Sequence, residues 1–133
     1  MVARGDGTFL LYAGYNGESY LDDLWELDLG TGRWRSLDLD PPAARRGDHA
    51  MIWEPVRGLL ATFGGSVHSD GVDLQLIDVE RGAVTASGPL PGPVVRTDHT
   101  LVLDSRSRAM VLFGGTPPDW TRTLNDTWML VLP

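Results

Sequence analysis

Short apolar runs that end in glycine recur along this chain at intervals of about fifty residues. They lie at 9–12, 59–63 and 109–113, and each is bounded by glycine. Such a run is too short for a helix and too continuous for a strand with one wet face, so it predicts a strand buried on both faces. A fixed period of this size indicates repeats, and the buried runs favour sheets that stack face to face.

Other positions follow the same spacing. Phe63-Gly64-Gly65 returns as Phe113-Gly114-Gly115 and, in weaker form, as Ala13-Gly14-Tyr15, while 46–49 (Arg-Gly-Asp-His) matches 96–99 (Arg-Thr-Asp-His). The glycines predict places where φ is positive or a neighbouring backbone passes closely. In the third repeat the register slips by three residues within the Pro-bearing loop 116–123, which a surface loop tolerates.

Ten strands are predicted, distributed three, four and three over the repeats. They fall near 8–13, 22–29, 33–38, 47–54, 58–64, 72–79, 83–87, 97–104, 108–114 and 125–132. The hairpin at 30–32 is tight, and Asp28 is expected to accept backbone N–H bonds there. Prolines at 41–42 and 89–93 mark linkers because proline cannot continue a strand. The chain is therefore divided into 1–40, an incomplete repeat; 41–91, a complete one; and 92–133, which lacks its last strand.

These elements together resemble a kelch repeat. The family has a first strand with Arg and His, a second ending in Gly-Gly, a third reading Asn-Asp-x-Trp, then a tight turn and an outer-strand Trp. Here 46–49, 96–99, 64–65, 114–115, 125–128 and 28–34 match. The departures are Gly14-Tyr15 in place of the first glycine pair, and Gln75 and Val84 where the second repeat would carry tryptophan. WD-repeat propellers have a shorter period and a Trp-Asp strand end that is absent here.

The resemblance implies an all-β fold, a partial kelch-type β-propeller with four-stranded antiparallel blades. The residues assigned to the repeat framework are Gly14, Gly64, Gly65, Gly114, Gly115, His49, His99, Trp25, Trp34 and Trp128. The three tryptophans are expected in the core, and the two histidines are expected to form hydrogen bonds between blades. Kelch propellers close with about five to seven blades, so fewer than three leave apolar surface bare. The missing blades would come from a longer parent chain or, alternatively, from homo-oligomerisation.

The loops after each second strand and the linkers are expected to share one face of the ring. The candidate ligand-binding residues there are Arg46, Arg96, Tyr20, His68, Trp120 and Arg122. Guanidinium groups bind carboxylates bidentately, and an exposed tryptophan stacks on a sugar or anchors a partner. The structural alternative is that each arginine pairs with Asp48, Asp98 or a linker carbonyl, and that Trp120 covers the blade.

Composition and charge limit the kinds of partner and cofactor that the chain is expected to bind. A formal charge of −7 argues against nucleic acid, because phosphate binding needs concentrated Lys and Arg. The chain has no cysteine, which excludes disulfides and thiolate metal sites but leaves the compartment open. No stretch has the length of a membrane span, and residues 1–7 lack the apolar core of a signal peptide. No catalytic or metal-binding motif stands out, so no cofactor is expected.

The sequence therefore predicts a non-catalytic binding scaffold whose partner is an acidic protein or peptide, or a carbohydrate. The alternative is a fragment of a carbohydrate-active propeller enzyme. Copper-dependent galactose oxidases use this fold with a Tyr–Cys crosslink, which a chain without cysteine cannot form. Bacterial sialic-acid epimerases also resemble the pattern and work without metal.

Overall fold

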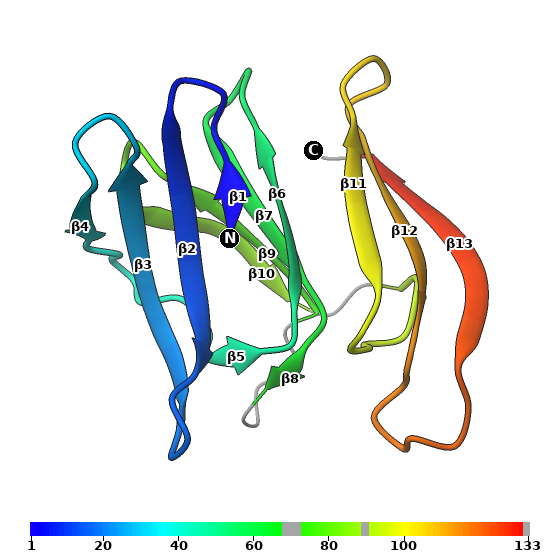
Figure 1. Ribbon diagram of the computed structural model, residues 1–133. Helices are drawn as coiled ribbons and strands as arrows, with labels where there is room; N and C mark the ends of the chain where they lie inside the picture. The colour runs from blue at the N-terminus through cyan, green and yellow to red at the C-terminus, as the bar shows by residue number, and fades with distance from the viewer. Residues whose placement is uncertain (68–72, 89–90, 132–133) are drawn as a thin grey trace.

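The chain forms antiparallel sheets that follow one another in sequence order (Figure 1). The computed structural model describes residues 1–67, 73–88 and 91–131, and these contain no helix. The first sheet holds β1 (Val2–Ala3), β2 (Thr8–Tyr15), β3 (Tyr20–Asp28) and β4 (Arg33–Leu37). The second holds β6 (Ala50–Glu54), β7 (Leu59–Phe63), β9 (Leu74–Asp78) and β10 (Ala83–Gly88). The third holds β11 (Thr100–Asp104), β12 (Ala109–Gly115) and β13 (Leu124–Val131), and β5 (Arg46–Gly47) pairs with β8 (Ser66–Val67).

The described part of the chain offers no helix that could cross a membrane.

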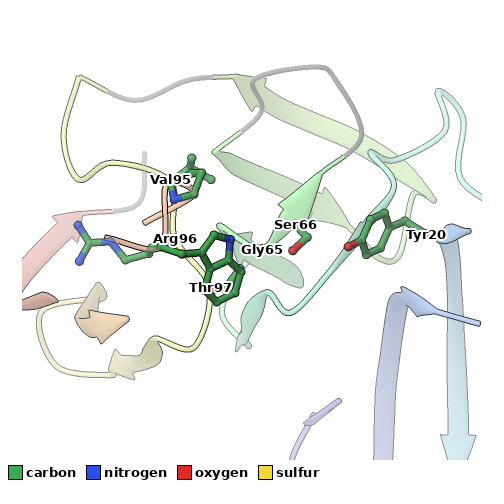
Figure 2. Close-up of a pocket in the computed structure, with 8 residues that line it drawn as sticks. Tyr20, Gly65, Ser66, Val95, Arg96 and Thr97 are labelled. Atoms are coloured by element: carbon green, nitrogen blue, oxygen red, sulfur yellow. The ribbon is translucent and has the colours of Figure 1, made fainter. Parts of the chain in front are cut away.

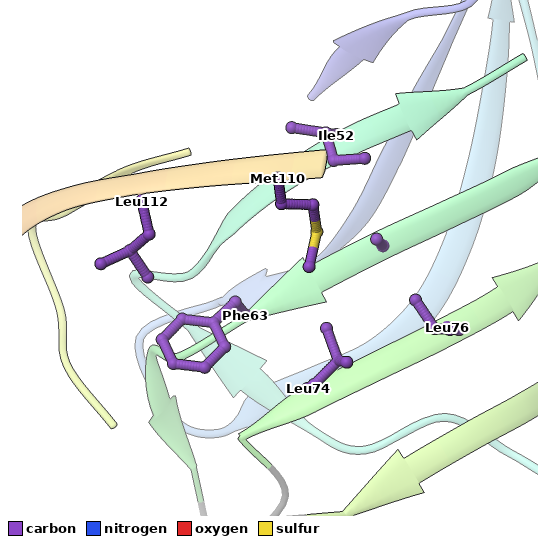
Figure 3. Packing of buried hydrophobic residues seen from close by; sticks show 7 residues of the cluster. Ile52, Phe63, Leu74, Leu76, Met110 and Leu112 are labelled. Carbon is purple, nitrogen blue, oxygen red and sulfur yellow. The ribbon is translucent and has the colours of Figure 1, made fainter. Parts of the chain in front are cut away.

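Two hydrophobic clusters join the three main sheets. One cluster lies between the first and second sheets and contains Leu10, Tyr12, Leu24, Leu60 and Ile77. The other joins the second and third sheets and contains Ile52, Ala61, Phe63, Leu74, Leu76, Met110 and Leu112 (Figure 3). The second sheet is thus packed on both faces, which makes it the centre of the molecule.

Burial of the three apolar runs depends on the place of their sheet in the stack. All five residues of β7 are buried, as predicted for a strand covered on both faces. In β2 the buried side chains alternate with half-buried ones, and β12 exposes Phe113. The prediction of two-sided burial is therefore right for 59–63 and wrong for the other two runs. Their sheets lie at the ends of the stack and have only one neighbour.

The first strand of the second repeat is interrupted by an aspartate, and the first strand of the third repeat is interrupted in the same way. Asp48 and Asp98 have φ angles of 54° and 55°, which no β-strand accommodates. The predicted strand at 47–54 is consequently split into β5 and β6, and the one at 97–104 begins only at Thr100. Aspartate tolerates the left-handed region better than most residues, so the conformation suits the residue type.

The glycine pairs occupy the positive-φ positions that were predicted for them. Gly64 and Gly65 have φ angles of 66° and 92°, and Gly114 and Gly115 have 66° and 100°. In the first repeat the positive angles belong to the 13–14 pair, at 54° and 122°, so the assignment of Gly14-Tyr15 to this role is wrong. The turn between the first two strands is one residue shorter in the first repeat than in the second. Ala3 pairs with Phe9 in the first repeat, whereas the equivalent Trp53 pairs with Leu60 in the second.

The tryptophans are less buried than predicted, although the turn chemistry is as expected. Trp34 is 47% exposed, Trp128 is 40% exposed and Trp25 is half-buried outside both hydrophobic clusters, so none of the three belongs to the core. Gln75, which stands where the first repeat has Trp25, is buried and accepts a hydrogen bond from the Tyr12 hydroxyl at 2.9 Å. Asp28 accepts the backbone N–H of Thr31 at 3.1 Å and so stabilises the hairpin.

Candidate functional site

A pocket of about 390 Å³ lies where loops of all three repeats meet beside β8 (Figure 2). The first repeat contributes Tyr20, at the start of β3. The second contributes Gly65 and Ser66, which directly follow β7. The third contributes the segment before β11 and the loop after β12. The described lining residues are Tyr20, Gly65, Ser66, Val95, Arg96, Thr97, Pro118 and Trp120.

Trp120 is held at this pocket by a strained turn. Its side chain is 66% exposed, and its backbone has a φ of 54°. The backbone N–H of Trp120 donates to the Pro117 carbonyl at 3.0 Å, which closes the turn. A bulky residue at positive φ is uncommon, and such strain costs on the order of 1 kcal/mol or more. The loop therefore keeps a large apolar ring in solvent against two energetic preferences.

Tyr20 forms the opposite side of the pocket and packs closely on the backbone. A Cβ atom on Gly47 would lie 2.8 Å from Tyr20 Cε1, so glycine at 47 makes room for the ring. The ring also lies 5.2 Å from that of Tyr15, measured between centroids. Tyr20 separates the main pocket from a second hollow of about 260 Å³, which Tyr15, Glu18, Ser19 and Arg45 also line.

The Arg96 side chain lies beneath the pocket and is 1% exposed. Its Nε donates to the Val94 carbonyl at 3.0 Å, and its Nη1 donates to the Gly114 carbonyl at 3.0 Å. Both terminal nitrogens bind the Asp126 carboxylate, at 2.6 and 3.2 Å. These hydrogen bonds, with one from the Trp128 indole, lower the pKa of Asp126 to about 2. The guanidinium charge is therefore compensated inside the protein.

Arg46 repeats this arrangement one sheet earlier. It is fully buried, and its Nη1 donates to the Gly64 carbonyl at 3.2 Å, as Arg96 does to Gly114. Burial lowers its pKa, whereas the nearby Tyr12 and Asp73 act in the opposite direction. Burial also raises the pKa of Tyr12 to about 12. Both arginines thus tie a first strand to the glycine pair of its own repeat.

The sequence allows Asp48 and Asp98 as partners of Arg46 and Arg96, but each forms its described hydrogen bond with a hydroxyl group. Both are exposed and border the pocket-lining residues. Asp48 accepts a hydrogen bond from the Ser66 hydroxyl at 3.2 Å, and Asp98 accepts one from Thr97 at 3.1 Å. The sequence signal for these aspartates is that each stands between an arginine and a histidine that recur fifty residues apart, but nothing in the sequence indicates their positive φ.

The two histidines connect neighbouring sheets through their rings. His49 lies edge-on to Tyr12 at 5.4 Å between centroids, and His99 lies in the same way against Phe63 at 5.6 Å. Neither ring nitrogen of His99 makes a hydrogen bond of good geometry, although weak interactions with the backbones of Phe63 and Arg96 act to raise its pKa. The edge-on contact with Phe63 therefore accompanies a weak polar link to the neighbouring sheet. Burial and the positive charge of Arg46 lower the pKa of His49 to about 4, and burial with Arg96 lowers that of His99.

Three of the six predicted ligand-binding residues meet at the pocket. They are Tyr20, Arg96 and Trp120. Arg46 is buried, Arg122 is exposed, and neither is among the described lining residues. His68 lies outside the described residues. Sequence analysis missed Ser66 and Thr97, whose positions next to the glycine pair and the repeated arginine are the only signal they carry. Among the described residues, no group of three or more His, Asp or Glu side chains could hold a metal ion.

No family model matches the chain, and no curated protein matches it either.

Proposed function

We propose that the chain is a segment of a kelch-type β-propeller that binds a carbohydrate without catalysis at the pocket between Tyr20 and Trp120. The architecture is supported by the stacked antiparallel sheets and by the arginine, histidine and glycine positions that recur in successive repeats. The observation that carries the function is the exposed, strained Trp120 ring at a pocket built by all three repeats. Strain of this kind concentrates at binding sites.

The chemistry of the lining favours a sugar over an acidic peptide. Ser66 and Thr97 donate their hydroxyl protons to Asp48 and Asp98 but keep oxygen lone pairs that can accept from a sugar, and Trp120 offers an apolar face on which a pyranose ring can stack. The carboxylates of Asp48 and Asp98 are exposed nearby and would accept hydrogen bonds from sugar hydroxyls. An acidic partner would need the guanidinium groups of Arg46 and Arg96, which bind carbonyl groups and a carboxylate of the protein itself.

The described lining also favours binding over catalysis. It contains no carboxylate and no histidine, and the buried Arg96 is its only charged residue. General acid–base catalysis needs a titratable pair within reach of the substrate. The carboxylates of Asp48 and Asp98 border the lining residues, and each already accepts a hydrogen bond from a neighbouring hydroxyl, which suits binding of sugar hydroxyls better than proton transfer.

Isothermal titration calorimetry with a panel of neutral and acidic sugars tests the proposal. An acidic peptide, the alternative class of ligand, is titrated in the same way. Trp120→Ala should weaken binding of the best sugar about tenfold, since loss of one stacking contact of about 1.4 kcal/mol corresponds to that factor. Val56→Ala is the control, because it removes an apolar side chain that is 74% exposed and lies away from the pocket.

Two results would overturn the proposal. One is sugar affinity that Trp120→Ala and Tyr20→Ala both leave unchanged while the fold is intact. The other is binding of the acidic peptide alone, lost on neutralising the arginines without any loss of stability.

A further inference from the structure

The two ends of the stack each expose a mainly apolar sheet face. The side chains of β11 to β13 alternate, so that Leu101, Met110 and Leu130 pack on the second sheet and their neighbours point away from it. We call the apolar ones among those neighbours the third-sheet outer face, which consists of Val102, Val111, Phe113, Met129 and Val131; Thr100 and Asp104 lie on the same side at the two ends of β11. Four of the five are 52–68% exposed, and Val111 is half-buried.

The opposite end of the molecule has a corresponding surface. In the first sheet Leu10, Tyr12 and Leu24 pack on the second sheet, so the alternate side chains face outward. We call the apolar members of this set the first-sheet outer face, which consists of Ala3, Phe9, Leu11, Trp25, Leu27 and Trp34. Asp23, which accepts the Trp25 indole N–H at 2.6 Å, is a charged neighbour on the same side of the sheet. An exposed patch of this kind marks an interaction site.

Strand register shows what each outer face is built to contact. In the second sheet, Ile52, Ala61 and Leu76 stand side by side across three strands. In the third sheet, Val102, Val111 and Met129 occupy the same three places. The row in the second sheet is buried against Leu103, Met110 and Leu130 of the third sheet, whereas the row in the third sheet is uncovered within the described residues.

The missing counterpart exists on the first-sheet outer face. Leu103, Met110 and Leu130 form a row across the third sheet, in the register 103–110 and 110–130. Ala3, Phe9 and Leu27 form the same row across the first sheet, in the register 3–9 and 9–27. The two outer faces are therefore the two halves of an interface that the chain already builds internally between its second and third sheets.

We propose that two copies of this chain pair head to tail, with the third-sheet outer face of each copy against the first-sheet outer face of the other. A second copy is the occupant because the complementary row lies on this same molecule. Such an interface is heterologous, and using it twice closes the assembly around a twofold axis. Closure at two copies rests on the propeller architecture proposed above, since six sheets fall within the usual number for a propeller.

The test is the solution mass of the full chain, measured by sedimentation equilibrium over a range of concentrations. Wild type should show twice the chain mass. Met129→Asp on the third-sheet outer face and Trp34→Asp on the first-sheet outer face should each give monomers. Val56→Asp, which places the same charge at a 74% exposed valine outside both faces, should remain dimeric. Circular dichroism establishes that each variant is folded.

Mixing the two monomeric variants separates head-to-tail pairing from other contacts. Each variant keeps one intact outer face, so an equimolar mixture should recover a dimer through one interface, whereas neither variant dimerises alone. Val102→Asp and Leu27→Asp provide a second pair if either first variant fails to fold. A wild-type monomer at all concentrations, an open-ended polymer, or a dimer insensitive to these changes would overturn the proposal. None of these results bears on sugar affinity, so failure here is distinguishable from failure of the proposed binding site.

Discussion

Two copies of one local structure, at 63–65 and at 113–115, differ almost entirely in their surroundings. The backbone is nearly the same, since the first glycine of each pair has a φ of 66° and the second has 92° or 100°. Yet Phe63 is 1% exposed and Phe113 is 52% exposed. The first copy is covered by residues 96–99 of the next repeat, and Gly65 donates a hydrogen bond to the Arg96 carbonyl at 2.8 Å.

The difference shows that the backbone conformation at 63–65 and 113–115 forms whether or not another sheet covers it. The glycine conformations form in both places because they are local, whereas burial of the aromatic ring requires a following repeat. The difference in unfolding free energy between substitutions at equivalent positions of the two copies therefore measures how much the following repeat contributes to stability.

The largest contrast is expected for the aromatic pair. Phe63→Ala should reduce the free energy of unfolding by about 4 kcal/mol, because it leaves a cavity between two sheets. Phe113→Ala in the monomer should cost less than about 1 kcal/mol, as for other exposed positions. Urea unfolding of both variants at low protein concentration provides the measurement. Equal costs would contradict the contrast, and a cost for Phe113 that grows with protein concentration would indicate coverage by a second copy.

The glycines should show the next largest difference. A Cβ on Gly64 would lie 2.8 Å from His99 Cε1 and would overlap the Arg96 carbonyl, in addition to the penalty of positive φ. On Gly114 the nearest atom is the Leu124 carbonyl oxygen, at 3.3 Å. Gly64→Ala should cost about 3 kcal/mol and Gly114→Ala about 1–2 kcal/mol, mainly from backbone strain. Thermal and urea unfolding of the two variants test this, and a smaller cost at Gly64 would exclude close contact there.

Arg96 is expected to act as a structural clamp. Arg96→Met leaves the Gly114 and Val94 carbonyls without their donor and should lower stability by about 2 kcal/mol. Arg122→Met, at an exposed arginine of the same repeat, is the control and should change stability by less than about 0.5 kcal/mol. Calorimetric unfolding would show the difference. Loss of ligand affinity at unchanged stability would instead make Arg96 a ligand-binding residue.

The last prediction is a gradual dependence of stability on pH. The pKa of His49 is about 4 in the folded protein and near 6.5 when unfolded, so the neutral ring stabilises the fold fully above pH 6.5. As the pH falls from 6.5 towards 4, only the unfolded chain gains the proton, and stability should decrease by about 1 kcal/mol per pH unit or less. Urea titrations at several pH values give the slope. His49→Gln should reduce the slope in this range without abolishing it, because the pKa of His99 is lowered in the folded protein too, while the loss of the Asp126 interaction below pH 3.8 should persist.

Periodicity alone predicted most of the strand pattern. The runs at 59–63 and 109–113 became β7 and part of β12, because short continuous apolar runs that end at glycine leave few alternatives to a strand. The position of the Gly64-Gly65 conformation was likewise predictable. Burial of the end sheets was not, since it depends on a neighbour that the pattern does not contain. Trp34 appeared to be a core residue for this reason.

The candidate site was less predictable than the fold. Tyr20 and Trp120 were chosen from loop position and residue type, and both line the pocket. Arg46 was chosen from its charge, but a buried arginine and an exposed one look alike in a sequence. Its burial is decided by the distance between the glycine carbonyls and the first strand, which only the folded chain determines. The left-handed conformation of Asp48 is equally a product of that packing.

The Arg96 clamp has a thermodynamic consequence for recognition. Its side chain joins the linker at Val94, the end of β12 at Gly114 and the start of β13 at Asp126, and the same residue forms part of the pocket. The pocket floor therefore cannot rearrange without breaking hydrogen bonds that lie inside the protein. The conformational entropy of the pocket floor is lost when the chain folds and not when a ligand binds. Ordering of the floor therefore reduces the binding free energy very little.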